Sequence, residues 1–259
     1  MHQKFIHAAS VCLLIAISLL SYPTEARNLY SIIAADTDDH IIGDSVLQDF
    51  THVRKKMQEI ANYLGIDLKE ISIRGEKTKP SILLATLNKA PIQKDDVVVF
   101  YYSGHGYRTQ SKGASPWPNL YFSTPDQGIK YELIMELLAD KHPRFLLTMV
   151  DVCNSFCPES GAPPLVTRPT DRPSSKEQQR IQSNYRHLFL DLPGSVHITS
   201  SAIGEYSYGY SDGGLYTNAF LSTLTYLTRT STQAEWGMIT HQAAELVEDR
   251  EHPHAELWL

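Results

Sequence analysis

The side chains best suited to covalent chemistry are one histidine and one cysteine, each in a short segment of small and polar residues. His105 lies between two glycines, and Cys153 stands two positions after Asp151. A cysteine thiolate attacks carbonyl carbons, and a histidine can take up the thiol proton and later return it. We therefore interpret Cys153 as a nucleophile and His105 as a general base for acyl transfer. The alternatives are a buried packing cysteine, a frequent role for that residue, and a core histidine.

Each of these segments follows an apolar run of strand length. The runs Val97–Tyr102 and Phe145–Val150 are rich in β-branched and aromatic residues without alternation, which is typical of strands covered on both faces of a parallel sheet. A short helix between them, marked by Ile134 and Leu138, allows the right-handed crossover that pairs strands in parallel. Since sites form at the carboxyl ends of such strands, the histidine and the cysteine are predicted to meet at one sheet edge.

The remaining apolar pattern predicts an α/β domain in which strands and helices alternate. Apolar residues from Val46 to Leu64 recur at steps of three and four, which predicts an amphipathic helix that Gly65 ends. Between Phe156 and Asn184, five prolines interrupt a polar stretch that we predict to be irregular. The other predicted elements are strands at 29–35, 68–73 and 196–199 and helices at 80–90 and 216–227.

Composition narrows the class of protein. The 259-residue chain has 42% apolar and 20% charged residues, which is ordinary for a globular protein with a sizeable core, and one domain is the simpler interpretation. The net charge of -6, without a basic stretch, argues against nucleic acid as a partner. No cofactor is indicated. His252 and His254 offer only two metal ligands, so a solvated tail is preferred to a metal site.

The N-terminal segment has the layout of a secretory signal peptide. Lys4 precedes an apolar run at 8–20, and Ala26 supplies a small residue at the expected cleavage point. The alternative is a membrane anchor, but the run falls short of the ~20 apolar residues that span a bilayer. We therefore predict a signal peptide at 1–26, a secreted or periplasmic protein, and no stable membrane insertion after signal removal.

Removal of the signal peptide leaves two cysteines, which excludes a disulfide scaffold. Cys157 lies four positions after Cys153. It is interpreted as a small packing residue. In an oxidising compartment, the alternative is a disulfide between the two that blocks the nucleophile.

A strand ending in Ser-Gly-His-Gly, then a helix, then a strand ending in Asp-Val-Cys resembles the caspase and metacaspase family of cysteine peptidases. The histidine precedes the cysteine by 48 positions, near the roughly 50 known for caspases. A later stretch, from Val196 to Thr217, is similar to the smaller subunit region of that family. The resemblance implies a caspase-like three-layer sandwich with a mostly parallel central sheet flanked by helices. The implied peptidase domain spans 27–259, with a large-subunit-like region at 27–155, a loop at 156–186 and a small-subunit-like region at 187–259.

The resemblance also implies how the site works. The oxyanion is expected to be bound by the backbone N–H groups of Gly106 and Cys153. The family works mainly with a Cys-His dyad, so no third catalytic residue is assigned. In metacaspases, the aspartate that matches Asp151 pairs with a substrate Arg or Lys, a geometry-selective contact; a turn cap is the alternative. Ser103 is expected to line the same pocket.

A second acidic wall of this pocket is expected from Asp36, at the end of the first predicted strand. For Asp36, Asp38 and Asp39, a polar turn is an equally good interpretation. The segments 205–206 and 213–214 are expected, from the resemblance alone, to build the far wall of the substrate cleft.

These features favour a cysteine endopeptidase that hydrolyses peptide or protein substrates after Arg or Lys. True caspases hold an aspartate with arginines, and none stands beside His105 or Cys153. The alternative is a catalytically inactive caspase-fold module that binds a peptide or protein partner. Asn154, where His or Arg is frequent, and Phe156, where Gly is usual, keep that alternative open. The sequence assigns no oligomeric state. Basic residues of the proline-rich stretch are candidate sites of self-cleavage: Arg168, Arg172, Lys176 and Arg180.

Overall fold

The computed structural model describes residues 28–122, 128–156 and 173–259. The predicted signal peptide at 1–26, together with Cys157, Arg168 and Arg172, lies outside the described residues. Inside these ranges, no helix is both long and apolar enough to cross a membrane.

Six strands form the central sheet of the described residues, in the order β11-β8-β7-β3-β1-β2. Neighbouring strands are parallel, except that β11 runs antiparallel to β8. The predicted parallel pairing of the two central apolar runs, now β3 and β7, is therefore confirmed. The bounds are β1 (Asn28–Ala35), β2 (Asp67–Arg74), β3 (Val97–Ser103), β7 (Phe145–Asp151), β8 (Gly194–Thr199) and β11 (His254–Trp258).

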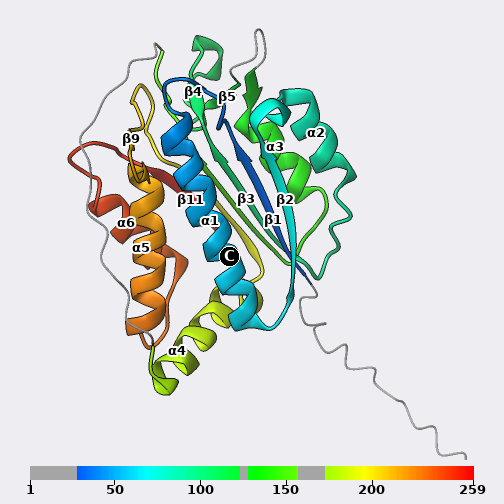
Figure 1. The fold of residues 1–259 in the computed structure, drawn as a ribbon, viewed down its shortest axis with the longest axis vertical. Helices are drawn as coiled ribbons and strands as arrows, with labels where there is room; N and C mark the ends of the chain where they lie inside the picture. The colour runs from blue at the N-terminus through cyan, green and yellow to red at the C-terminus, as the bar shows by residue number, and fades with distance from the viewer. Residues whose placement is uncertain (1–27, 123–127, 157–172) are drawn as a thin grey trace, which may run out of the picture.

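Helices cover both faces of the sheet, as Figure 1 shows. One face carries α1 (Gly43–Leu64), α4 (Ser175–Arg186), α5 (Leu215–Thr230) and α6 (Trp236–Glu245). The other face carries α2 (Pro80–Lys89) and α3 (Tyr131–Ala139). This arrangement confirms the predicted three-layer α/β architecture.

Short elements fill the connections between these layers. After β3 the chain forms a small antiparallel sheet, and before α5 it forms a two-stranded ribbon. None of these short strands was predicted, because runs of two or three residues show no periodicity. They are β4 (His105–Tyr107), β5 (Asn119–Tyr121), β6 (Gly128–Lys130), β9 (Gly209–Tyr210) and β10 (Gly213–Gly214), with short helices η1 (Gly75–Lys77), η2 (Gln110–Lys112) and η3 (His187–Asp191).

The helix α1 follows the predicted apolar stripe. Val46, Phe50 and Val53 are buried against the sheet, as their spacing along one helix face requires. Gly65 ends the helix with a left-handed φ of 67°, a conformation in which glycine has no side-chain clash.

Strand alternation decides which face each site residue occupies. In β3, Val97, Val99 and Tyr101 join the core beneath α1 and α5, whereas Val98, Phe100 and Tyr102 join the core beneath α2 and α3. Successive side chains point to opposite faces. Ser103 therefore lies on the α1 face. Side chains alternate in the same way along β7, which places Asp151, at the end of that strand, on the α1 face as well.

The prediction of an irregular stretch from Phe156 to Asn184 is wrong from Ser175 onward, where α4 begins. The Ser174 hydroxyl accepts the Glu177 N–H, and the Glu177 carboxylate accepts the Ser174 N–H, so the two residues form a capping box. The last proline, Pro173, stands just before this cap. Lys176 and Arg180, two of the candidate self-cleavage residues, lie inside the helix.

The prediction of a solvated tail around His254 is also wrong. β11 extends the sheet by pairing antiparallel with β8, and His254 lies opposite Thr199. The imidazole of His254 packs edge-on against Trp117, with 5.1 Å between the ring centroids. Backbone hydrogen bonding across the sheet, which composition does not reveal, orders this segment.

A buried tryptophan supports the base of the strand that leads to Cys153. Trp236 is 0% exposed, stacks on Phe145 of β7 at 5.4 Å, and donates its indole N–H to the Leu188 carbonyl. We expect Trp236→Ala to lower the free energy of unfolding by about 3 to 5 kcal/mol, because it leaves a cavity and an unpaired carbonyl. Trp258→Ala, at a side chain 66% exposed, is the matched control and should cost less than about 1 kcal/mol. Equal losses of both variants in urea titrations would contradict this account.

Candidate active site

The histidine and the cysteine meet where the parallel strands β3 and β7 end. In the register of these strands, Ser103 lies opposite Asp151. Gly106 packs directly on the nucleophile segment, and a side chain there would collide with the Cys153 carbonyl oxygen and with Val152. The predicted placement of both residues at one sheet edge is therefore confirmed, and glycine is required at position 106 by this close approach.

The Cys153 thiol is held by the main chain of Ser207. It donates to the Ser207 carbonyl oxygen at 3.7 Å and accepts the Ser207 N–H at 3.4 Å. Burial raises the pKa of the thiol, the Ser207 N–H lowers it, and the charge of Asp151 raises it further. The thiol is therefore protonated at neutral pH in the free protein, so nucleophilic attack requires a base.

The His105 imidazole pairs with a carboxylate. Its Nε2 lies 3.1 Å from Oδ2 of Asp39, and the other Asp39 oxygen accepts the N–H groups of Ile41 and Ile42. Within the described ranges, no hydrogen bond joins His105 to Cys153, because the thiol is turned toward Ser207. Catalytic hydrogen bonds of this kind often form only when substrate is bound.

The pairing of His105 with Asp39 was not predicted; the sequence left Asp39 as a polar turn. The order of the sheet places β1 beside β3, so the loop after β1 reaches the loop after β3. Nothing in the sequence fixes that order. The only signal available was an aspartate shortly after the carboxyl end of a predicted strand.

Asp151 is buried, and its carboxylate is held by Ser207 and by the start of α5. Oδ1 accepts the Ser207 hydroxyl at 2.5 Å, and Oδ2 accepts the Thr217 N–H at 3.0 Å and the Thr217 hydroxyl at 2.6 Å. The alternative in which Asp151 caps the next turn is therefore wrong. The helix N-terminus, which carries partial positive charge, favours a carboxylate at this place.

Asp49 of α1 is a second buried acid, bonded to Ser103. The Ser103 hydroxyl donates to Oδ2 of Asp49 at 2.7 Å, and the Gly214 N–H donates to Oδ1 at 2.7 Å. Burial raises the pKa of the Asp49 carboxyl well above its usual range, and the charge of Asp151 adds to the shift. A side chain at Gly214 would clash with Oδ2 of Asp151 and approach Oδ2 of Asp49 to 3.1 Å, so both carboxylates lie against one glycine.

Glu251 is a third buried acid, from the segment before β11. Its Oε1 accepts the Tyr208 N–H at 2.5 Å and lies 3.2 Å from the Ser207 hydroxyl. Burial raises the pKa of the Glu251 carboxyl well above its usual range, and the charge of Asp151 raises it further. We call Asp49, Asp151 and Glu251 the acidic cluster.

Sequence reasoning missed Asp49 and Glu251. Asp49 had a signal, because it interrupts the buried face of α1 between Val46 and Phe50, where an apolar residue is expected. Aspartate is almost never fully buried unless it is paired, so an aspartate on the buried face of a helix indicates a specific polar partner. For Glu251, which precedes a strand that was not predicted, we find no signal.

The structure places Asp36 away from the acidic cluster, which corrects the expectation of a second wall there. The charge of Asp36 acts on Tyr102, whose ring belongs to the core beneath α2 and α3. Because Ala35 faces the α1 side, alternation turns the next residue to the opposite face. Asp49, and not Asp36, is the acid beside Ser103.

Asn154 fixes the loop that follows the nucleophile. Its N–H donates to the Glu205 carbonyl, its carbonyl accepts the Gly204 N–H, and its side-chain amide donates to the Pro116 carbonyl at 2.7 Å. Arg108, itself buried, donates to the Asn154 side-chain oxygen at 3.3 Å. Asparagine at this position thus serves packing and backbone order, and the segment 205–206 contacts the nucleophile loop directly.

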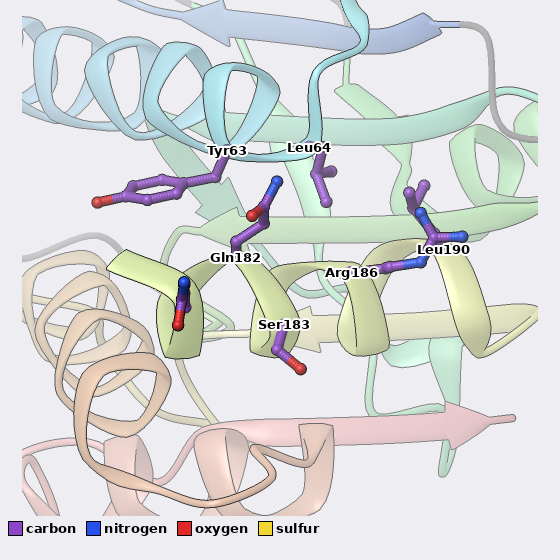
Figure 2. A pocket seen from close by; sticks show the side chains of 7 residues that line it. Tyr63, Leu64, Gln182, Ser183, Arg186 and Leu190 are labelled. Carbon is purple, nitrogen blue, oxygen red and sulfur yellow. The ribbon is translucent and has the colours of Figure 1, made fainter. Parts of the chain in front are cut away.

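A separate hollow of about 250 Å³ lies between the end of α1 and α4, as Figure 2 shows. α1 runs back along the sheet, so this hollow lies by the amino ends of the strands, far from His105 and Cys153. Arg186 is the one charged residue among the described residues that line it, and it pairs with Asp191 at 3.6 Å.

Metal ligation has no support in the described part of the chain, where no group of three or more His, Cys, Asp or Glu side chains is arranged to hold an ion. His252 pairs with Glu205 at 2.8 Å, and His254 lies 3.4 Å from Glu256. The two histidines thus have separate acidic partners.

Comparison with known proteins agrees with this geometry. The caspase domain family model matches residues 54–251. The crystal structure of caspase-1 from Spodoptera frugiperda is similar, with a TM-score of 0.54 and 13% identity over 90% of this chain and 86% of that chain. At that identity the likeness concerns the fold alone, and the sequence matches no curated protein. Because the family model spans most of the chain, the protein belongs to the caspase-like family of cysteine peptidases.

Proposed function

We propose that the protein is a cysteine endopeptidase that cleaves peptide bonds after Arg or Lys and that acts outside the cytoplasm. The observation that carries this specificity is the acidic cluster, which shares Ser207 with the nucleophile. The oxygens of three carboxyl groups in one buried place can accept the N–H groups of a cationic side chain, and they offer no positive charge to an aspartate. Arg provides the planar fork of N–H donors that such oxygens accept, and Lys provides a point charge.

Proton transfer is assigned to the Nδ1 atom of His105. Nε2 faces Asp39, which favours the tautomer with a proton on Nε2 and leaves Nδ1 as the acceptor. The Cys153 S–H bond breaks as its proton moves to Nδ1, and the sulfur attacks the scissile carbonyl. The imidazolium then protonates the leaving amine, and water hydrolyses the thioester by the same route.

The oxyanion is assigned to the backbone N–H groups of Cys153 and Gly106. The close packing of Gly106 on the Cys153 carbonyl oxygen and on Val152 supports this pair, because it brings the two segments into contact at the sheet edge. Donors fixed before the reaction stabilise the developing charge without reorganisation.

The dyad assignment predicts that Cys153→Ala and His105→Ala each abolish hydrolysis of fluorogenic peptides with Arg at the cleavage position. The double variant should be scarcely slower than either single variant, because the two residues act as a unit. Circular dichroism checks that the variants are folded. A Cys153→Ala variant with full activity removes the proposed nucleophile, and a folded wild type that binds such peptides without cutting them identifies a binding module instead.

The carboxylate partner predicts a second effect. Asp39→Asn should lower kcat by at least about tenfold. An amide no longer favours the His105 tautomer with its proton on Nε2, and it no longer stabilises the imidazolium that forms during proton transfer. KM should change little, since Asp39 does not belong to the acidic cluster. Asp38→Asn, at the exposed neighbouring residue, is the matched control. Unchanged kcat in Asp39→Asn would show that His105 works without this partner.

The specificity assignment predicts that Asp151→Asn narrows the preference for Arg over citrulline, its uncharged isostere. The loss of one charged contact should reduce kcat/KM for Arg substrates by roughly 30-fold and leave citrulline substrates nearly unchanged. The ratio of kcat/KM for Arg and citrulline substrates reports recognition of the charge alone, because a loosening of α5 would lower kcat/KM for both substrates. Preference of the wild type for Asp over Arg rejects the assignment.

A further inference from the structure

Two buried polar atoms beside the acidic cluster have no hydrogen-bond partner among the described residues. One is Oε2 of Glu251, on a side chain that is 0% exposed, and the other is the hydroxyl of Tyr216, also 0% exposed. Buried polar atoms are nearly always paired, and leaving one unpaired costs about 1 to 3 kcal/mol. Two such atoms flanking one cluster indicate a place where a ligand, or a proton, completes the bonding.

The Ser207 hydroxyl cannot serve both neighbouring carboxyl groups. It has one proton, and its oxygen lies 2.5 Å from Oδ1 of Asp151 but 3.2 Å from Oε1 of Glu251. The shorter contact is with Asp151, so among the described residues Glu251 keeps the Tyr208 N–H as its one donor. A second ionised carboxylate beside Asp151 would be repelled, which favours the neutral form of Glu251 in the free protein.

Groups from several elements face Glu251, and none of them is a cation. Arg250, the adjacent basic residue, is exposed to solvent. Burial and the charge of Asp151 raise the pKa of Glu251, in agreement with a neutral carboxyl. The facing groups are Asp151 at the end of β7, Cys153 just after it, Asp49 on α1, Tyr216 on α5 and Tyr210 of β9.

We propose that Glu251 is a specificity-determining residue whose carboxyl releases its proton when a cationic substrate side chain enters the acidic cluster. The inference rests on the proposed function and adds a residue to it. The O–H bond of Glu251 breaks, the proton passes to solvent, and the carboxylate oxygens accept N–H groups of the incoming cation. Selectivity arises because an uncharged side chain does not stabilise the ionised form.

The direction of the pH effect follows from the same exchange. Below the pKa of Glu251 in the complex, no proton leaves and the affinity for a cation is low. Between the pKa values of the complex and of the free protein, binding releases a proton and the affinity rises with pH. Above the pKa of the free protein, the carboxylate is already ionised and the affinity levels off.

The test measures binding of benzamidine, an amidinium with a planar N–H fork, to the full chain. Calorimetry between about pH 5 and pH 8, in two buffers of different ionisation enthalpy, gives both affinity and released protons. The wild type should release a proton. Glu251→Gln should release less, bind at least about tenfold more weakly at the higher pH, and lose the pH dependence. Glu248→Gln, at an exposed glutamate three positions earlier, should behave as wild type.

If Glu251→Gln releases as many protons and binds benzamidine as tightly as the wild type, the proposal is overturned. The proposed preference for Arg or Lys would then still stand. If the wild type itself neither binds benzamidine nor cleaves Arg peptides, the proposed function fails and this inference fails with it. Asp49→Asn removes the other acid with a raised pKa and serves if Glu251→Gln does not fold. Proton release that persists in Asp49→Asn supports Glu251, and release that vanishes there assigns the proton to Asp49.

Discussion

The site depends on one constraint, the parallel register of β3 and β7. Because Ser103 lies opposite Asp151, the two segments that leave the sheet begin at the same level, and a histidine and a cysteine two residues further on lie at one edge. A slip of one residue would turn Ser103 and Asp151 to opposite faces. The buried, uninterrupted apolar character of both strands stabilises the register, since every side chain of β3 and β7 is buried.

Grouping three acids in the interior is unfavourable unless the surrounding structure supplies donors or a countercharge. Donors come from the first turn of α5, from Gly214 and from the loop that carries Ser207. That loop also holds the Cys153 sulfur through its main chain. The acidic cluster and the Cys153 thiol are thus linked through one serine, whose main chain turns the sulfur toward itself.

Much of the fold was predictable because its strands are apolar runs and its longest helix has a regular stripe. The placement of His105 and Cys153 at one edge of the sheet was predictable too, since both residues follow such runs directly. The expectation for Asp36 was wrong because side chains alternate along a strand, and the residue after Ala35 points to the opposite face of the sheet. Asp39, Glu251 and β11 were beyond prediction because they depend on which strands become neighbours, and α4 was missed although Ser174 and Glu177 carry a capping signal.

The helix α1 joins both halves of the chemistry in one rigid body. At its entrance, the Asp39 carbonyl accepts the Gly43 N–H while the Asp39 carboxylate holds His105. Farther along, the same helix presents Asp49 to Ser103. A translation of α1 over the sheet would therefore displace the partner of His105 and the partner of Ser103 together. In the proposed enzyme, a change in the packing of this helix would alter the surroundings of His105 and of Ser103 at once, so neither can be adjusted independently through α1.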